Sequence, residues 1–225
     1  MVNLSLIRST LIANAVSIIS LASLLLVPSQ AAVINGNFDN DLKNWEAKGS
    51  VNLIDGQALM SAYGDDVTVV ETFLELSDGT LNAVNRTSAA NGSAIKQTIT
   101  VNAGDILSFN WKFQGGDYLP FNDFSFYSIN SIAYKLADIA QVGSFEESSS
   151  QTFHTFQTAG TYTIGFGVLN ALDTSGTSFL AIDNVKVSST TTVPEPASII
   201  GILTISAISG TSALKRKQLV KARQN

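Results

Sequence analysis

The sequence predicts an all-β domain of the β-sandwich class, because alternating strand patterns recur, turn signals separate them and no segment has a convincing amphipathic helical pattern. Apolar and polar residues alternate with a period of two, as in half-buried strands. The expected strands are 57–62, 95–101, 107–113, a long strand at 123–134, and 162–168. Turn signals rich in Gly, Asn and Asp stand at 102–105, 115–117, 159–160 and 173–176. Strands at this spacing favour a sandwich.

The last expected strand contains a change of parity. Leu180 and Ile182 share one face, whereas Val185 and Val187 share the other. One extra residue in a strand produces this shift, so the sequence predicts a β-bulge at Asp183–Asn184.

Composition excludes several classes of function. The chain has no Cys, which rules out disulfides, thiolate metal sites and a Cys nucleophile. All 18 acidic residues lie between Asp39 and Glu195, against seven basic residues in that stretch, so its net charge is −11. Such a segment repels nucleic acid and anionic lipid. His154 is the single histidine, which disfavours a Ser-His-Asp triad or a histidine metal site, and we expect it to be structural.

The N-terminus has the layout of a secretory signal peptide over residues 1–31. Arg8 precedes an apolar run from 11 to 27, and Pro28 ends it. The tripeptide 29–31 places small residues before a cleavage site after Ala31. The alternative is a retained N-terminal membrane anchor.

The C-terminus contains a second apolar segment. Residues 197–214 are uncharged and just long enough to cross a bilayer as a helix. Lys215, Arg216 and Lys217 open a basic tail over 215–225. A basic cluster on this flank stays in the cytoplasm, so everything before Pro194 is expected to face outward.

The motif Val193-Pro194-Glu195-Pro196 stands directly before this span. The order of motif, span and basic residues over 193–217 resembles the PEP-CTERM sorting signal of Gram-negative bacteria. That resemblance implies a bacterial protein that an exosortase cleaves near the motif. The protein would be membrane-anchored before processing, then held at the cell surface, outer envelope or extracellular matrix. The alternative is a simple C-terminal anchor. The domain then spans 32–188, with a short linker at 189–192.

The edges of the domain carry a second resemblance. It opens with Ile34-Asn-Gly-Asn-Phe-Asp39 and Trp45, and closes with Leu180-Ala-Ile-Asp-Asn-Val-Lys-Val187. This pairing resembles the galactose-binding-like jelly roll, a fold of many carbohydrate-binding modules. The resemblance implies a jelly-roll β-sandwich and a structural Ca²⁺ that ties the opening strand to the closing one. On matching positions Asn37, Asp39 and Asp183 would be its ligands. The alternative is that these residues form turns and hydrogen bonds without metal.

One loop is the first candidate for a glycan site. Tyr118 lies between Gly-Gly and Pro120, with Asp117, Asn122 and Asp123 beside it. An aromatic ring can stack on a sugar while amides and carboxylates bond its hydroxyl groups. The alternative is a structural loop with a solvated acidic edge.

Three functions follow, in order of preference. The first is a non-catalytic envelope protein that binds a glycan, such as the cell's own exopolysaccharide. The second is a structural or adhesive matrix protein that acts through protein contacts. The third is a glycoside hydrolase, which needs only a suitably spaced carboxylate pair.

Overall fold

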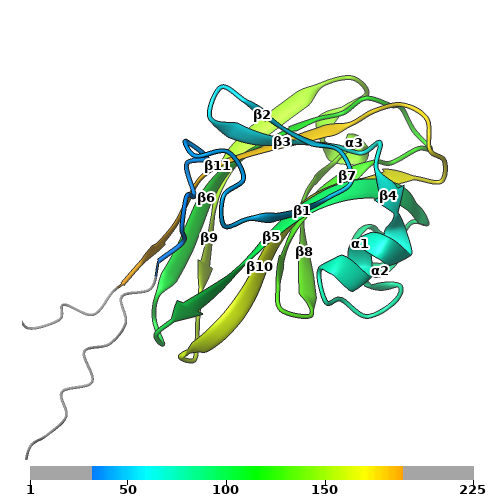
Figure 1. The fold of residues 1–225 in the computed structure, drawn as a ribbon. Coiled ribbons are helices and arrows are strands. Elements are labelled where there is room, and N and C mark those ends of the chain that lie inside the picture. Colours follow the sequence, from blue (N-terminus) through cyan, green and yellow to red (C-terminus); the bar gives the residue numbers. More distant parts are fainter. Residues whose placement is uncertain (1–31, 190–225) are drawn as a thin grey trace, which may run out of the picture.

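The structure is a computed structural model that describes residues 32–189. It is all-β, with two antiparallel sheets packed face to face and three short helices (Figure 1). The expected signal helix, sorting motif and C-terminal span lie outside the described residues. Among residues 32–189 no helix is long and apolar enough to span a membrane.

The first sheet, sheet A, has the strand order β1-β5-β10-β7-β8, with β4 also paired to β5. Its longest strands, β5 and β10, pair antiparallel from Gly160↔Val101 to Ala171↔Ala89, which confirms the strands expected at 95–101 and 162–168. The strands are β1 (Glu46–Lys48), β4 (Asp65–Asp66), β5 (Ala89–Val101), β7 (Phe124–Ile129), β8 (Ile132–Asp138) and β10 (Gly160–Ala171).

The second sheet, sheet B, has the order β2-β3-β11-β6-β9. Its strands confirm the expectations at 57–62 and 107–113. They are β2 (Val51–Ile54), β3 (Gln57–Ser61), β6 (Ile106–Gln114), β9 (Glu147–Thr155) and β11 (Phe179–Ser188).

The core lies between the sheets, where the apolar faces of both meet. Phe109 of β6 packs edge-on against Phe166 of β10, with ring centroids 4.7 Å apart, and Trp45 contacts the same Phe166 at 6.0 Å. All three side chains are buried, and so is Trp111. Each fully buried side chain of this size stabilises the fold by about 1.5–3 kcal/mol.

Two helices cover the outer face of sheet A, at the right of Figure 1. They are α1 (Val67–Phe73) and α2 (Thr80–Asn85), and a third, α3 (Ile139–Val142), follows β8. The sequence analysis predicted the all-β class and did not anticipate these three short helices. The α1 sequence is rich in β-branched residues that favour strands, and both covering helices are too short to show a helical period. The carboxylate of Glu71 accepts the Gly79 and Leu81 N–H groups at the start of α2, which joins the two helices.

The long strand expected at 123–134 is instead a hairpin of β7 and β8. Asn130 turns the chain with φ 49°, a conformation that Asn tolerates. Its backbone N–H donates to the Thr163 carbonyl and its Oδ1 accepts from the Thr163 N–H. The apolar alternation continues through this turn, which is why the pattern concealed it.

The opening turn docks on the last strand at the predicted bulge. The register of β11 against β6 shifts between Asp183 and Lys186, and Asn184 has φ 53°, which confirms the bulge. The Val185 N–H donates to the Gly36 carbonyl at 2.8 Å. A Cβ added at Gly36 would lie 1.9 Å from the Val185 carbonyl oxygen, so only glycine permits this approach.

We expect Gly36→Ala to destabilise the domain by about 1–3 kcal/mol, because the added methyl forces the opening turn off β11. Gly160→Ala is the matched control, since its Cβ would meet only an ordinary contact at 3.5 Å. Chemical denaturation of the two purified variants measures the difference. Equal free energies of unfolding would contradict the docking account.

Candidate functional site

The candidate site lies at the end of the sandwich opposite Ser188, where the last strand, β11, ends. At one end of sheet B, Ser188 pairs with Ile106, and Ile106 with Thr155. At the other end Gln114 pairs with both Phe179 and Glu147. The loops beyond this second end, at 115–123, 143–146 and 172–178, are therefore neighbours, and we call them the distal loops.

Exposed aromatic rings gather on two of the distal loops. Tyr118 is 54% exposed and its ring lies edge-on to Phe121, with centroids 5.7 Å apart. Phe145, 64% exposed, reaches the same Tyr118 ring at 6.5 Å. We call Tyr118, Phe121 and Phe145 the aromatic platform. An exposed group of large rings is uncommon on a soluble surface and is typical of a contact site.

A cleft of about 370 Å³ is lined in part by Val142 and Glu147, the two residues that flank the turn that carries Phe145. It runs between the β8–α3 corner of sheet A and the start of β9. Its walls mix apolar groups with an amide, a carboxylate and a hydroxyl, as in sites for small polar ligands. The lining residues are Trp111, Leu136, Ala137, Gln141, Val142, Glu147 and Ser148. Glu147 also pairs with Lys112 at 2.6 Å.

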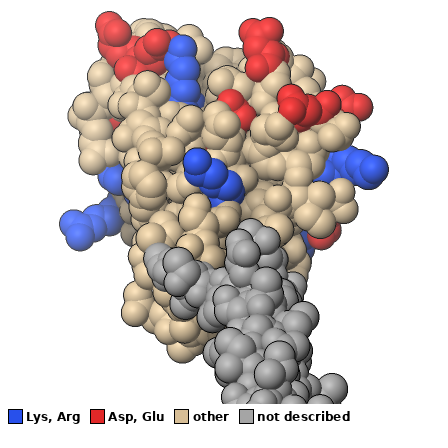
Figure 2. All heavy atoms as spheres, turned by 90° about the vertical axis from the view of Figure 1, so that its left-hand side faces the viewer, with Lys and Arg blue, Asp and Glu red and all other residues tan. Residues whose placement is uncertain are grey.

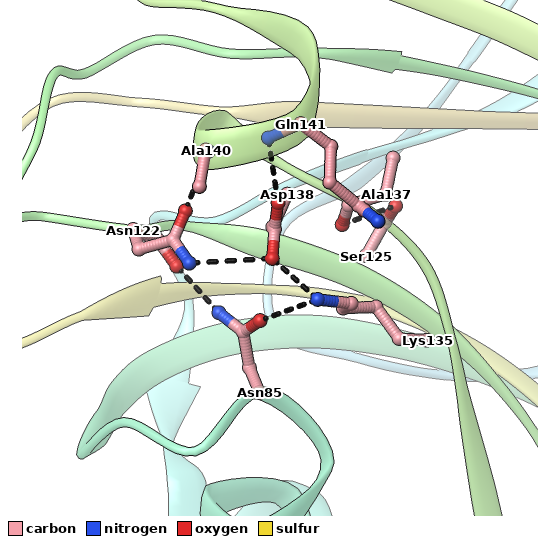
Figure 3. Close-up of polar contacts among 8 residues, drawn as sticks. All are labelled: Asn85, Asn122, Ser125, Lys135, Ala137, Asp138, Ala140 and Gln141. Carbon is pink, nitrogen blue, oxygen red and sulfur yellow. Dashed lines mark hydrogen bonds and ion pairs between the residues drawn. The ribbon is translucent and has the colours of Figure 1, made fainter.

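A polar network fixes the end of the Tyr118 loop (Figure 3). Asn122 accepts the Ala140 N–H at 2.8 Å through Oδ1, and its Nδ2 donates to Asp138 at 3.3 Å. Lys135 donates to Asp138 at 2.5 Å and to Asn85 at 3.2 Å. Asn85, from the end of α2, donates to the Asn122 carbonyl at 2.7 Å. Asn122 is thus a positioning residue for the loop.

Asp117 and Asp123 point inward and do not belong to the exposed part of the loop. They are 5% and 0% exposed. Asp117 Oδ1 accepts the Tyr118 N–H. Asp123 accepts the Ala171 N–H at 2.9 Å and the Ser178 hydroxyl at 2.7 Å, and Ser178 Oγ in turn accepts the Gly116 N–H. Of the four residues expected to bind a glycan, only Tyr118 is therefore exposed. Asp117 and Asp123 are buried, and Asn122 is half-buried.

Burial raises the pKa of Asp123 to about 7. The hydrogen bonds from Ser178 and Ala171 oppose this rise, while the negative charges of Asp117 and Asp173 add to it. A carboxyl with a raised pKa can serve as a general acid in a glycosidase. Here, however, both of its oxygens are engaged beneath the loop.

The three residues expected to bind calcium at the domain edges stand in local hydrogen bonds. Asn37 donates to the Asp39 carboxylate. Asp183 accepts the Asn184 backbone N–H and side-chain amide at 2.6 and 2.8 Å. Among residues 32–189 no group of three or more His, Asp or Glu side chains could hold a metal ion. The opening turn and last strand do meet, through Gly36 and Val185, and calcium at these residues stays a prediction.

A second hollow crosses the outer face of sheet B. Its volume is about 320 Å³, and small Ala181 forms part of its surface. The other lining residues are Gln57, Asn110, Trp111, Lys112, Ser149 and Ser150. It offers amides and hydroxyls, whereas its one aromatic side chain, Trp111, is 9% exposed and donates its Nε1–H to Thr152. The aromatic platform therefore suits ring stacking better.

His154 belongs to an aromatic group at the open edge between β8 and β9. Its ring contacts Tyr134 at 5.8 Å and Phe156 at 5.2 Å, and Tyr127 stacks on Tyr134 at 4.8 Å. Burial lowers the pKa of His154, so the imidazole is held neutral at pH 7. These contacts agree with the structural role expected for this residue.

Charge is unevenly spread over the surface. Figure 2 shows one face on which acidic side chains gather toward the upper end, while basic side chains stand singly. Neutral ligands and cations are better suited to such a surface than polyanions.

Phe121 and Phe145 are site residues that the sequence analysis missed. Phe145 lies two residues after Gly143 and has φ 61°, which is rare for a bulky side chain. An aromatic residue close to a glycine, between two expected strands, was the signal that could have revealed it.

In EDTA, we expect the stability of Asp123→Asn relative to the native protein to rise between about pH 4 and pH 7. Below the ordinary pKa of 3.8, Asp123 is protonated in both the folded and the unfolded state, so its titration does not affect stability. As pH rises from there toward 7, the unfolded state ionises while the folded state stays protonated, and the native protein loses stability relative to the variant. Each pKa unit corresponds to about 1.4 kcal/mol, so the change amounts to a few kcal/mol. Denaturation at a series of pH values measures it. Since His154 is present in both proteins, parallel curves would contradict the buried carboxyl.

Comparisons with known proteins are limited to the fold. No family model matches the chain, and no curated protein matches it. A family 61 carbohydrate-binding module, solved with β-1,4-galactotriose, is similar over 71% of this chain and 99% of its own, at 11% identity and TM-score 0.41. A mannan-recognising family 27 module is similar over 72% of this chain and 97% of its own, at 13% identity and TM-score 0.38. The N-terminal cellulose-binding domain of a Cellulomonas fimi β-1,4-glucanase is similar over 73% of this chain and 99% of its own, at 9% identity and TM-score 0.36. TM-scores of this size do not indicate that the binding sites of these modules correspond to any site in this chain.

Proposed function

We propose that this protein is exported, sorted through residues 193–217 to the bacterial cell envelope, and binds a glycan through the aromatic platform and the adjoining cleft. The exposure of Tyr118 and Phe145 around a shared ring contact carries the proposal. These rings remain exposed although the domain buries most of its other aromatic side chains in the core.

The chemistry of the site suits a neutral sugar polymer. Pyranose rings have apolar C–H faces that pack on aromatic rings and hydroxyl groups that need hydrogen-bond partners. The platform supplies the rings, and Gln141, Glu147 and Ser148 supply an amide, a carboxylate and a hydroxyl in the cleft. Exopolysaccharide of the producing cell is the glycan class that an envelope location favours.

The position of the platform suits a surface-attached protein. The described chain ends near Ser188, and the distal loops follow the other end of the same strands. A nine-residue strand such as β6 extends for about 30 Å at 3.3 Å per residue. A protein held through its C-terminal segment would therefore present the platform away from the membrane.

A second candidate function, adhesion through protein contacts, is favoured by the edge strand β9. This strand is nine residues long, pairs regularly with β6 and carries one charge, Glu147. Phe153 on it is 63% exposed. Edge strands without charges, bulges or proline can pair with another chain.

We expect Tyr118→Ala or Phe145→Ala to weaken binding to the producing bacterium's purified exopolysaccharide by about fivefold, because each removes a stacking surface worth about 1 kcal/mol. Tyr63→Ala is the matched control, since Tyr63 is 67% exposed and lies outside the platform. Affinity electrophoresis in native gels measures the effect. Equal losses in all three variants, or no retardation of the native protein, would contradict the platform as the glycan site.

We expect the segment after the sorting motif to be removed during export. A C-terminal epitope tag should therefore be absent from the mature envelope form. Replacing Pro194 and Pro196 by Ala should retain the tag, because the two prolines of the proposed recognition motif are lost. Thr190→Ala is the control in the linker. Immunoblots of envelope fractions test this, and a tagged mature native protein would contradict processing.

A further inference from the structure

An amine, an amide carbonyl and a carboxylate meet where α2 approaches β8 (Figure 3). Lys135 Nζ donates to Asp138 Oδ2 at 2.5 Å and to Asn85 Oδ1 at 3.2 Å. Lys135 and Asp138 belong to β8, whereas Asn85 is the last residue of α2, 50 positions from Lys135. The network that fixes the Tyr118 loop therefore holds a nucleophile, an electrophilic carbon and a base in direct contact.

Two different partners fix the orientation of the Asn85 amide. Its Nδ2 donates to the backbone carbonyl of Asn122 at 2.7 Å, and its Oδ1 accepts from Lys135 Nζ. Exchanging the two amide atoms would set donor against donor and acceptor against acceptor. Given this 3.2 Å contact and a C=O bond of about 1.23 Å, Lys135 Nζ lies within roughly 4.4 Å of Asn85 Cγ. The flexible stem of the lysine can close the remaining distance.

The three groups are largely shielded from water. Asn85 and Asp138 are buried, and the side chain of Lys135 is 30% exposed. Transfer of a proton from the ammonium to the carboxylate costs less here than in water, because it replaces two poorly solvated charges by two neutral groups. The neutral amine is the nucleophilic form of lysine. Groups held this close by a helix and a strand react as if at a high concentration.

We propose that Lys135 and Asn85 become joined by an intramolecular amide bond, with Asp138 as the general base and acid. Asp138 takes a proton from the Lys135 ammonium, and the neutral Nζ attacks Asn85 Cγ. Asp138 returns this proton to Asn85 Nδ2, and the Cγ–Nδ2 bond breaks. Nζ then passes a second proton through the same carboxylate to the departing ammonia. One ammonium group and one primary amide become a secondary amide and an ammonium ion, so the step needs no oxidant, reductant or other reactant.

This bond would staple the domain in a chain that has no cysteine. It closes a loop of 50 residues between α2 and β8. A covalent link across a loop of this length stabilises the fold mainly by restricting the unfolded chain, as a disulfide does. The inference rests on these three side chains and does not depend on glycan binding.

Peptide mass spectrometry of the full-length protein tests the bond. The purified protein is kept folded at about pH 8, where more of the lysine is neutral than at pH 7, then denatured and digested with trypsin. Trypsin does not cleave after an acylated lysine. We therefore expect peptide 49–86 joined to peptide 113–186, uncut after Lys135. The joined pair should be lighter than the sum of the two peptides by one ammonia.

Lys135→Arg and Asp138→Asn are the diagnostic variants. Arginine keeps the positive charge and the hydrogen bonds but cannot form the amide bond, and asparagine can still cap α3 while it removes the base. Both should give separate peptides 49–86, 113–135 and 136–186. Lys112→Arg is the matched control, since Lys112 pairs with Glu147 outside the network, and it should keep the joined pair.

Thermal unfolding, followed by the fluorescence of Trp45 and Trp111, shows that each variant folds. The native protein should unfold at a temperature on the order of 10 °C above that of Lys135→Arg. Only free peptide 113–135 from the native protein, or a bond from Lys135 to a residue other than Asn85, would overturn the proposal. Equal yields of the joined pair in Asp138→Asn would overturn the role of Asp138. Glycan binding is not measured here, so failure of this bond is distinguishable from failure of the platform.

Discussion

The buried carboxyl of Asp123 is the interaction on which the distal end depends. One oxygen receives the last backbone N–H of β10, and the other receives the Ser178 hydroxyl, which itself accepts the Gly116 N–H. A single side chain thus joins the end of one sheet to the start of β11 and to the loop after β6. The raised pKa of Asp123 reflects how completely this junction is removed from water. This junction and the Asn122 network fix the two ends of the 115–123 loop, which carries Tyr118 and Phe121 of the platform.

The exposed ring of Tyr118 and the buried carboxylate of Asp117 belong to adjacent residues of one loop. Asp117 faces inward and its neighbour Tyr118 faces outward, as successive residues of an extended loop do. The same arrangement explains why acidic residues in this loop need not contact a ligand.

Sequence alone predicted the sandwich because its strands have one buried face, and period two follows directly from that. It also located the β11 bulge, since the apolar residues of this strand change from even-numbered positions to odd-numbered positions at Asp183–Asn184. Helix α1 was missed because Val67, Val69 and Val70 favour strands locally, and packing on sheet A overrides that preference. Helix α2 was missed because its six residues are too few to show a helical period. The hairpin at Asn130 was missed because alternation continues across the turn.

The candidate site was predicted only in part, because local sequence patterns mark an exposed loop but do not encode contacts between residues far apart in the sequence. Tyr118 was found because a Gly- and Pro-flanked aromatic marks an exposed loop. The inward direction of Asp117 and Asp123 depends on contacts with residues more than 50 positions away, such as Ser178 and Gly176, and no local pattern encodes such contacts. Phe145 joins the platform for the same reason, through the pairing of β6 with β9.

The most direct test of the glycan-binding account is chemical-shift mapping by NMR of the isotope-labelled protein, titrated with oligosaccharides prepared from the producing bacterium's exopolysaccharide. The account predicts shifts concentrated at Tyr118, Phe121 and Phe145 and along the cleft at Gln141 and Ser148. Shifts confined to the sheet B hollow at Asn110 and Ala181, or no shifts at saturating oligosaccharide, would contradict it.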